Sequence, residues 1–249
     1  MSLETQAINK TFLIGRSGEA IRVLLDISFQ AKEGQFISIV GPIGCGKTTL
    51  LRIISGLEQA TKGQVIMDGT ILEGRDPQIG LVFQEPALFR WRTALQNIEF
   101  GLEILKKEKK SRQAAAREYL QAFGLERFGD KYPDELSSGM RQKVAIARTL
   151  IPNPKVLLMD EPFSFLDSQT RISMQNFLLK VWDEKKITII FVTHNVDEAV
   201  FLSDKILVLS ERPARVVETI EIDLTRPRDR VSSETYAIQR KILNLLAHQ

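Results

Sequence analysis

One stretch of the chain constrains its fold more than any other: QFISIVGPIGCGKTTLLRIISGL, residues 35–57. The branched apolar run 35–40 is typical of a buried strand, and the leucines and isoleucines after the loop recur at helical spacing. Between them, GPIGCGKT matches the pattern G-x-x-x-x-G-K-[ST], whose glycines turn backbone N–H groups toward phosphates. The stretch therefore predicts a strand, a phosphate-binding loop and a helix, with a nucleoside triphosphate as ligand.

Within this loop, particular residue types suit particular parts of the ligand. Lys47 is expected to reach the β- and γ-phosphates, and the Thr48 hydroxyl is expected to ligate Mg²⁺. Backbone groups along the loop and at the start of its helix are expected to surround the phosphates. The nucleotide-binding residues predicted here are Gly41, Pro42, Ile43, Gly44, Cys45, Gly46, Lys47, Thr48 and Thr49.

Cys45 is the only cysteine of the chain, which excludes an internal disulfide. A neighbouring lysine and a helix N-terminus both lower a thiol pKa, so one hypothesis is that alkylation of Cys45 blocks nucleotide binding and that ATP protects it. The favoured interpretation is that Cys45 is a small residue filling a free position in the loop.

A second apolar run, PKVLLMDEP, ends in two acids and resembles a parallel strand whose carboxyl end faces a ligand. Asp160 is placed to hold Mg²⁺ through water, and Glu161 to orient or deprotonate the attacking water. Adjacent acids alone would more often be a solvated strand end, but after a phosphate loop the functional interpretation is favoured.

Two more predicted strands end in polar side chains. His194 follows the strand 187–192, and a neutral imidazole can donate to a γ-phosphate oxygen. Gln84 follows the apolar run 79–83 and could ligate Mg²⁺ or orient water. Phe12, near the N-terminus, could stack on adenine, although a core aromatic is a comparable interpretation.

The segment DELSSGMRQKVAIARTL begins a long helical run with small residues, Ser137, Ser138 and Gly139. Serine is a preferred N-cap, and a helix N-terminus offers free N–H groups to an anion. No glycine-rich loop precedes this helix start, so the sequence pattern alone does not say which anion it meets.

The chain has 249 residues, 43% hydrophobic and 26% charged, and a net charge of +3. This composition is that of an ordinary globular protein, and so small an excess of positive charge argues against binding to nucleic acid. No apolar run approaches the ~20 residues needed to span a bilayer. We therefore expect a protein without a membrane segment, in a reducing compartment.

Taken in order, these motifs resemble the ATP-binding subunit of ATP-binding cassette (ABC) transporters. The resemblance implies an α/β P-loop NTPase fold with a RecA-like core sheet, an N-terminal antiparallel β subdomain and an inserted helical subdomain. The whole chain, 1–249, would be one ABC ATPase domain. Its expected parts are the nucleotide-binding core with the β subdomain at 1–86 and 155–225, the helical subdomain at 87–154 and a C-terminal helix at 226–249.

In that family the segment around Ser137 corresponds to the signature Leu-Ser-Gly-Gly-Gln, which meets the γ-phosphate of ATP held by the opposite subunit. The resemblance thus implies a homodimer with two composite sites, and Asp167 would lie across the same interface. The sequence departs from the pattern at Ser138 and Met140, and also at Ile43 and Phe165. An added Cβ at Ser138 is harmless only where its φ is negative.

A narrower likeness links the segments following Gln84 and Ser137, together with the tail LSERPARVVETIEIDLTRPRDR, to nitrate, sulfonate and taurine importers. It implies transport-coupled ATP hydrolysis on the cytoplasmic face of the membrane, with separate permease subunits and indirectly a solute-binding protein. Phe89, Trp91 and the helix from Thr93 are candidates for the permease contact, although a buried Trp91 is an equal alternative. The rival interpretations are a non-transport ABC ATPase acting in DNA repair or translation, and a small-molecule kinase.

Overall fold

The computed structural model describes residues 2–14 and 19–247, which form two compact units. The first unit comprises residues 1–76 and 179–249, and the second comprises residues 77–178. Each unit is described by itself below.

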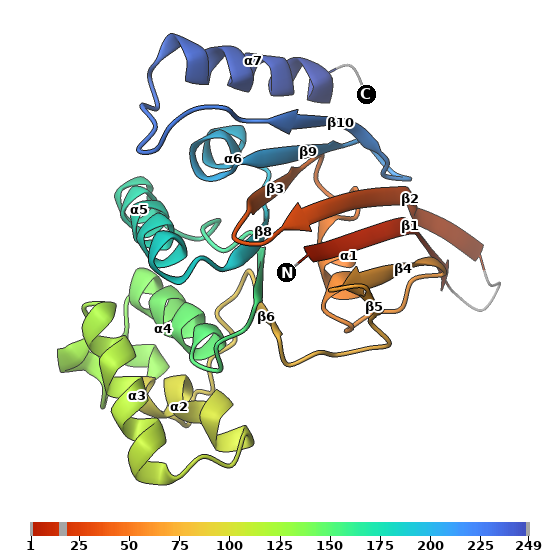
Figure 1. The fold of residues 1–249 in the computed structure, drawn as a ribbon. Helices are drawn as coiled ribbons and strands as arrows, with labels where there is room; N and C mark the ends of the chain where they lie inside the picture. Colours follow the sequence, from red (N-terminus) through yellow and green to blue (C-terminus); the bar gives the residue numbers. More distant parts are fainter. Residues whose placement is uncertain (1, 15–18, 248–249) are drawn as a thin grey trace. The chain divides into compact units, whose positions relative to one another are not determined.

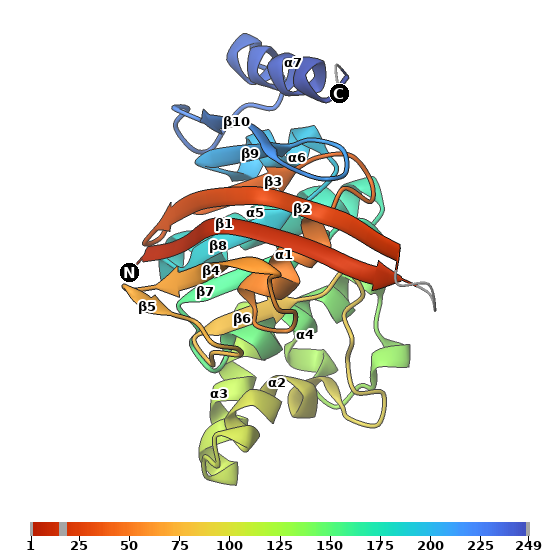
Figure 2. The ribbon, with the colours of Figure 1, turned by 90° about the vertical axis from the view of Figure 1, so that its right-hand side faces the viewer.

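The first unit contains an antiparallel sheet built from the N-terminal part of the chain. Its strand order is β2-β1-β4-β5, and β1 and β2 are long strands that run side by side (Figure 2). Apolar side chains alternate along β2, so that Val23, Ile27, Phe29 and Ala31 are buried. This confirms the predicted N-terminal β subdomain. The strands are β1 (Ser2–Ile14), β2 (Glu19–Lys32), β4 (Lys62–Met67) and β5 (Thr70–Ile71).

A second set of strands in the same unit is parallel at its centre. Strand β3 pairs in parallel with β8 on one side and with β9 on the other, and β10 adds to β9 in antiparallel fashion. Every residue of β3 and β8 is buried, which explains why both read as continuous apolar runs. The strands are β3 (Phe36–Val40), β8 (Thr188–Val192), β9 (Lys205–Leu209) and β10 (Val216–Glu221).

The helices of the first unit are α1 (Lys47–Ile54), α6 (Val196–Leu202) and α7 (Ser233–Ala247). Helix α7 lies against α6 and β9 (Figure 1). Buried side chains of β3, α6, β9 and β10 form one cluster with Ile242 of α7. The carboxyl ends of β3 and β8 lead into α1 and α6 respectively, which brings the phosphate loop and His194 to one edge of the parallel strands.

The second unit pairs two parallel strands and carries the helices inserted between them in sequence. Helix α2 begins with a capping box, in which Thr93 and Gln96 each accept a hydrogen bond from the other's backbone N–H. The predicted helical subdomain is confirmed. The elements are β6 (Ile79–Val82), α2 (Ala94–Ile104), α3 (Lys109–Ala122), the 3₁₀ turns Glu126–Phe128 and Pro133–Glu135, α4 (Ser138–Leu150) and β7 (Val156–Asp160). Helix α5 (Ser168–Lys185) contains the boundary between the units.

Candidate functional site

The phosphate loop joins β3 to α1 in the first unit. The Lys47 ammonium lies inside it, 5% exposed, and donates to the carbonyl oxygens of Gly41 and Pro42 at 2.8 Å each. Its side chain is therefore folded back over the loop, against neutral oxygens. An anionic phosphate oxygen is a stronger partner for an ammonium than a carbonyl is, so the loop is built to accept one.

Gly46 occupies the N-cap of α1 with φ 128°, a conformation that L side chains rarely adopt. A Cβ here would also lie 2.8 Å from both Val23 Cγ1 and Leu24 Cδ2 of β2. The second glycine of the motif is thus required by backbone conformation and by packing. Thr48 and Thr49 follow as the second and third residues of α1, both half-buried.

Cys45 is 2% exposed, and burial raises the pKa of its thiol above the ordinary value. Lys47 and Arg212 act in the opposite direction, but burial is the larger effect. The hypothesis of an activated thiol was therefore wrong, because residue spacing showed the nearby charge but not the depth of the side chain. The burial agrees with the favoured interpretation of a small residue filling the loop.

This geometry predicts slow alkylation of Cys45. Since a raised pKa leaves less thiolate near neutral pH, iodoacetamide should modify the folded chain at least about tenfold more slowly than the urea-unfolded chain. The rate should rise with pH, because deprotonation limits the reaction. Mass spectrometry of timed samples measures it, and equal rates in the folded and unfolded chains would contradict the assignment.

His194 is exposed in the turn between β8 and α6, and the residues on either side of it are held by hydrogen bonds. The Thr193 hydroxyl donates to Glu198 Oε2 at 2.7 Å and accepts from the Asn195 N–H at 3.0 Å. Asn195 in turn caps α6, because its side chain accepts from the Glu198 N–H. These bonds fix the backbone on both sides of His194. In the sequence THNVDE, an asparagine three residues before a glutamate is a pattern typical of a helix N-cap. The roles of Thr193 and Glu198 were nevertheless not predicted from the sequence.

Phe12 lies in β1 and is half-buried, with the Lys10 ammonium 4.6 Å from the centre of its ring. It pairs across the sheet with Ile21 of β2. A ring that is partly accessible at a strand can still stack on a base, so this residue stays a prediction.

In the second unit, Asp160 ends β7 and is 8% exposed, and Glu161 follows it with φ 42°. A non-glycine residue at positive φ carries backbone strain, and such strain gathers at functional sites. The Ser164 hydroxyl donates to the Glu161 carbonyl oxygen at 2.9 Å and accepts from Gln84 Nε2 at 3.2 Å. Two of the predicted residues are thus linked through Ser164, which sequence reasoning missed because a single serine in a loop carries no signal.

The signature helix α4 begins as the sequence suggested. The Ser137 hydroxyl accepts from the Met140 N–H at 3.3 Å, and Ser138 is the first helical residue, outside the positive-φ set. The condition for tolerating a serine at position 138 is therefore met. A Cβ at Gly139 would lie 2.7 Å from Thr170 Cγ2, so this glycine allows α4 and α5 to approach closely.

Asp167 precedes α5 and accepts from the N–H groups of Gln169 and Thr170 at 3.1 and 3.0 Å. These hydrogen bonds, led by those from Thr170, lower the pKa of its carboxyl group. Asp167 is exposed, and its place at a dimer interface stays a prediction.

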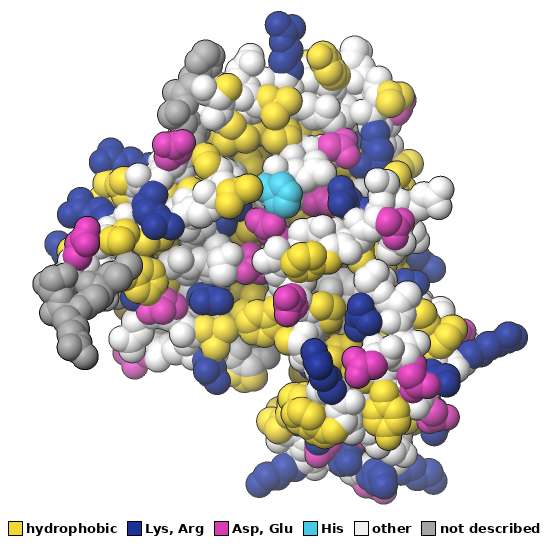
Figure 3. All heavy atoms as spheres, turned by 180° about the vertical axis from the view of Figure 1, so that it is seen from behind, with side chains coloured by type: hydrophobic (Ala, Val, Ile, Leu, Met, Phe, Trp, Pro, Cys, Tyr) yellow, Lys and Arg dark blue, Asp and Glu magenta, His cyan; other side chains and the backbone are white. Residues whose placement is uncertain are grey.

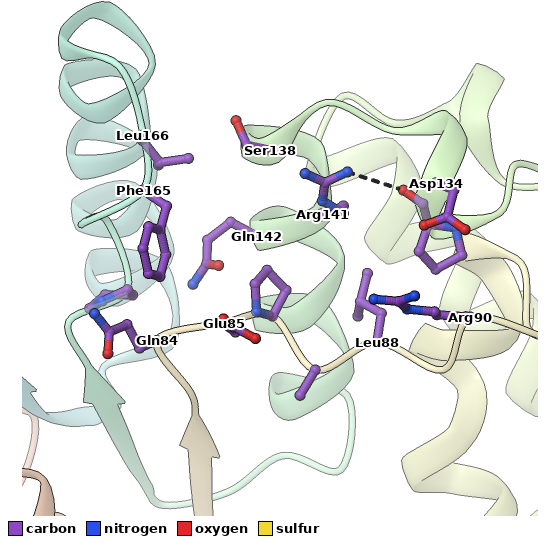
Figure 4. A pocket seen from close by; sticks show the side chains of 14 residues that line it. Gln84, Glu85, Leu88, Arg90, Asp134, Ser138, Arg141, Gln142, Phe165 and Leu166 are labelled. Atoms are coloured by element: carbon purple, nitrogen blue, oxygen red, sulfur yellow. Dashed lines mark hydrogen bonds between the residues drawn. The ribbon is translucent and has the colours of Figure 1, made fainter.

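Gln84, the start of α4 and the loop after β7 enclose a pocket of about 420 Å³ within the second unit (Figure 4). Gln142 extends into it from α4, on the side of Gln84 and Phe165. Its side chain is 2% exposed, and its Nε2 has no hydrogen-bond partner among the described residues. The pocket therefore lies between Gln84 and the signature helix α4.

Comparison with known proteins places these features in one family. A family model described as ABC transporter matches residues 24–164. The chain is 48% identical to an uncharacterized ABC transporter ATP-binding protein of Methanocaldococcus jannaschii, over 99% of this chain and 92% of that one. It is 40% identical to an aliphatic sulfonates import ATP-binding protein of Bacillus cereus, over 98% and 95%. It is 42% identical to a nitrate import ATP-binding protein of Synechocystis sp., over 97% and 90%.

A solved structure shares the fold and much of the sequence. It is a dimeric ATP-binding cassette in a post-hydrolysis state with ADP and Pi, 33% identical, with a TM-score of 0.78 over 90% of this chain and 100% of that one. These relatives support a transport ATPase over the alternative in DNA repair or translation. The chain belongs to the ABC transporter family, of which it is an ATP-hydrolysing, ATP-binding subunit.

Proposed function

We propose that this subunit powers an importer of a small anion or organic solute such as nitrate, a sulfonate or taurine. The observation that carries the proposal is the similarity, along nearly the whole chain, to subunits named for sulfonate and nitrate import. The predicted likeness of the RPRDR tail to the same importers supports it.

Each predicted residue has a chemical task toward ATP. Lys47 pairs with the β- and γ-phosphates, Glu161 takes the proton of the attacking water, and His194 donates to a γ-phosphate oxygen. Phe12 stacks on adenine. These groups act by positioning the reactants and stabilising charge, which is how proteins catalyse phosphoryl transfer.

Mg²⁺ would be held by Thr48, Asp160 and Gln84, and it would neutralise charge on the phosphates. No group of three or more His, Cys, Asp or Glu side chains able to hold a metal occurs among the described residues. The donor set still fits, because Mg²⁺ in nucleotide sites needs only one or two protein carboxylates and takes its other ligands largely from phosphate oxygens and water. The buried Asp160 carboxylate supplies the one charged ligand.

Two copies of the chain would complete each other's sites, in keeping with the dimeric form of the related cassette. Ser137, Ser138 and Gly139 of one copy would bind the γ-phosphate held by its partner, through the N–H groups at the start of α4. Ser137 at the start of α4, Asp167 and Phe165 are all exposed, which supports this arrangement.

An aromatic surface made of Phe89, Trp91 and Phe100 is our candidate for the permease contact. Trp91 is 73% exposed, so the alternative of a buried tryptophan is excluded. The Phe89 ring centre lies 5.4 Å from that of Trp91 and 4.6 Å from that of Phe100. On the face drawn in Figure 3, hydrophobic side chains are interspersed with Lys and Arg side chains.

The loop that carries this aromatic surface is held rigidly. The fully buried Asn97 side chain accepts from the Phe89 N–H and donates to the carbonyl oxygens of Phe89, Arg92 and Thr93. Arg148 donates to the carbonyl oxygens of Pro86 and Ala87, in the segment after Gln84. A preformed surface loses little conformational entropy on binding. Within the described residues, no helix is long and apolar enough to cross a bilayer.

Trp91→Ala should therefore weaken permease binding without changing the ATPase activity of the isolated subunit. Loss of an aromatic anchor at an interface costs about 2 kcal/mol or more, equivalent to roughly 30-fold in affinity. Surface plasmon resonance on the permease in nanodiscs measures the affinity. Tyr236→Ala, which removes an exposed aromatic from α7, is the matched control and should bind normally. Unchanged binding of Trp91→Ala would exclude this surface.

The transported solute is tested with the assembled transporter in proteoliposomes. A solute-binding protein loaded with nitrate, taurine or an alkanesulfonate should stimulate ATP hydrolysis, and only the cognate solute should do so. Hydrolysis that no solute-binding protein or permease stimulates would contradict a role in import.

A further inference from the structure

The motif RPRDR, residues 226–230, lies between β10 and α7, and nothing in the ATP chemistry above uses it. Its three arginines all reach helix α6 within the first unit. Arg228 is the central one and is 7% exposed, which is unusual for a cation. We define these three side chains, Arg226, Arg228 and Arg230, as the arginine clamp.

Arg228 binds the carboxyl end of α6. Its guanidinium donates through Nη1 to the carbonyl oxygens of Val200 at 2.7 Å, Phe201 at 3.3 Å and Ser203 at 2.6 Å. The last carbonyl groups of a helix have no partner inside the helix, and they form the negative end of its dipole. One buried cation therefore satisfies several of them at once.

The other two arginines hold α6 on either side of Arg228. Arg226 donates to the Leu202 carbonyl oxygen at 2.6 Å, pairs with Asp204 and stacks at 4.5 Å on the ring of Trp182. Arg230 pairs with Asp197 at 2.8 Å and lies 3.5 Å over the Phe201 ring.

Helix α7 contributes to the same contacts. Gln239 donates to the other oxygen of Asp197 at 3.0 Å. Ile242 of α7 belongs to the apolar cluster that also contains Val196, Ala199 and Val200 of α6. Both the arginine clamp and α7 therefore contact α6.

The opposite end of α6 carries His194, two residues before the helix begins. With only seven residues, α6 is too short to be stable by itself, so its position depends on its tertiary contacts. The amino end is held by Thr193, Asn195 and Glu198, and the carboxyl end by the clamp. A helix of this length moves as one body, and a displacement at one end reaches the other.

We infer that Arg228, supported by Arg226 and Arg230, is a positioning group that holds His194 at the γ-phosphate by anchoring the far end of α6. This inference rests on the role of His194 in the proposed function. The clamp touches no predicted substrate group itself, so it acts only through the helix.

The burial of Arg228 agrees with such a task. Burial, with the nearby Arg226, lowers the pKa of Arg228 to about 10, so it is still a cation at neutral pH. Burying a charge contributes little net stability, because its loss of hydration offsets much of what its hydrogen bonds provide. A methionine of similar length removes the donors to the last carbonyl groups of α6 and so frees the end of the helix. Circular dichroism checks that the variant is folded.

The test compares Arg228→Met and Arg228→Lys in the full chain, with Arg240→Met as the matched control. Arg240 is an exposed arginine on α7. Arg228→Met should lower kcat by roughly 10- to 100-fold, the usual effect of misplacing a catalytic group by about 1 Å. Binding of ATP, measured by fluorescence titration, should change by less than about threefold, since a lost transition-state contact affects kcat. Arg228→Lys, which keeps a donor cation, should recover much of the activity.

A double variant tests whether Arg228 acts through His194. In it, Arg228→Met is introduced into a chain that already carries His194→Ala. If the clamp acts through His194, Arg228→Met should then lower kcat by less than about twofold further. A second full loss in that background would overturn the inference and leave the proposed function intact. If His194→Ala alone kept normal turnover, the role of His194 in the proposed function would fail, and the clamp inference with it.

A direct readout is available because the chain has only two histidines. In ¹H–¹³C spectra of the folded chain with a non-hydrolysable ATP analogue, the imidazole signal absent from His194→Ala identifies His194. This signal should shift in Arg228→Met and stay in place in Arg240→Met. An unmoved His194 signal in a folded Arg228→Met chain would also overturn the inference, even where activity is too low to measure.

Discussion

Glu161→Gln is expected to lower turnover by about 10²–10⁴, the usual contribution of a positioned general base. An amide has nearly the shape of a carboxylate, so the variant keeps the backbone at Glu161, with its positive φ, and the Ser164 contact to its carbonyl oxygen. It cannot accept the proton of the attacking water. Binding of ATP should be unchanged, and the ATP-bound dimer should last longer, because only hydrolysis opens it.

Phosphate release and analytical ultracentrifugation measure these two effects. Glu118→Gln, on the exposed face of α3, is a matched control and should behave as wild type. Normal turnover in Glu161→Gln would remove Glu161 from the mechanism.

A mixed dimer tests whether two chains share each site. When one chain carries Lys47→Ala and the other Ser137→Arg, both changes fall in one composite site and the second site is intact. Such a dimer should keep about half of the wild-type activity, on the basis of site number alone. Placing both changes in one chain and pairing it with wild type damages both sites, so this dimer should be nearly inactive.

The two mixtures contain the same substitutions in equal amounts, so the comparison controls for effects on folding. Tagged chains and sequential affinity purification isolate each mixed dimer. Equal activity of the two arrangements would show that each chain hydrolyses ATP alone.

Much of the fold followed from local pattern. The buried strands β3, β7 and β8 were predicted to within about one or two residues, because continuous apolar runs bounded by loops leave few alternatives. The start of α4 was predicted because Ser137 has the side chain that an N-cap requires. Gly46 was predicted from its motif, and its positive φ explains why that motif needs glycine.

Other features depended on contacts between distant segments, and local pattern did not determine them. The pKa of Cys45 is raised because the folded chain buries the thiol, whereas sequence showed only the neighbouring lysine. Trp91 could be placed either in a core or on the surface, and the fold exposes it. Nothing in RPRDR indicated that Arg228 would meet helix α6, since the two are about 27 positions apart in the chain.

The sequence by itself determined the family, the strand–loop–helix that binds phosphate and the order of the predicted catalytic groups. Each of these depends on residues adjacent in the chain, whose backbone preferences and side-chain chemistry act locally. Tertiary structure alone decided how deeply each group is buried and which side chains hold it in place. Burial and support arise from long-range packing, in which side chains from separate segments compete with water for the same polar groups.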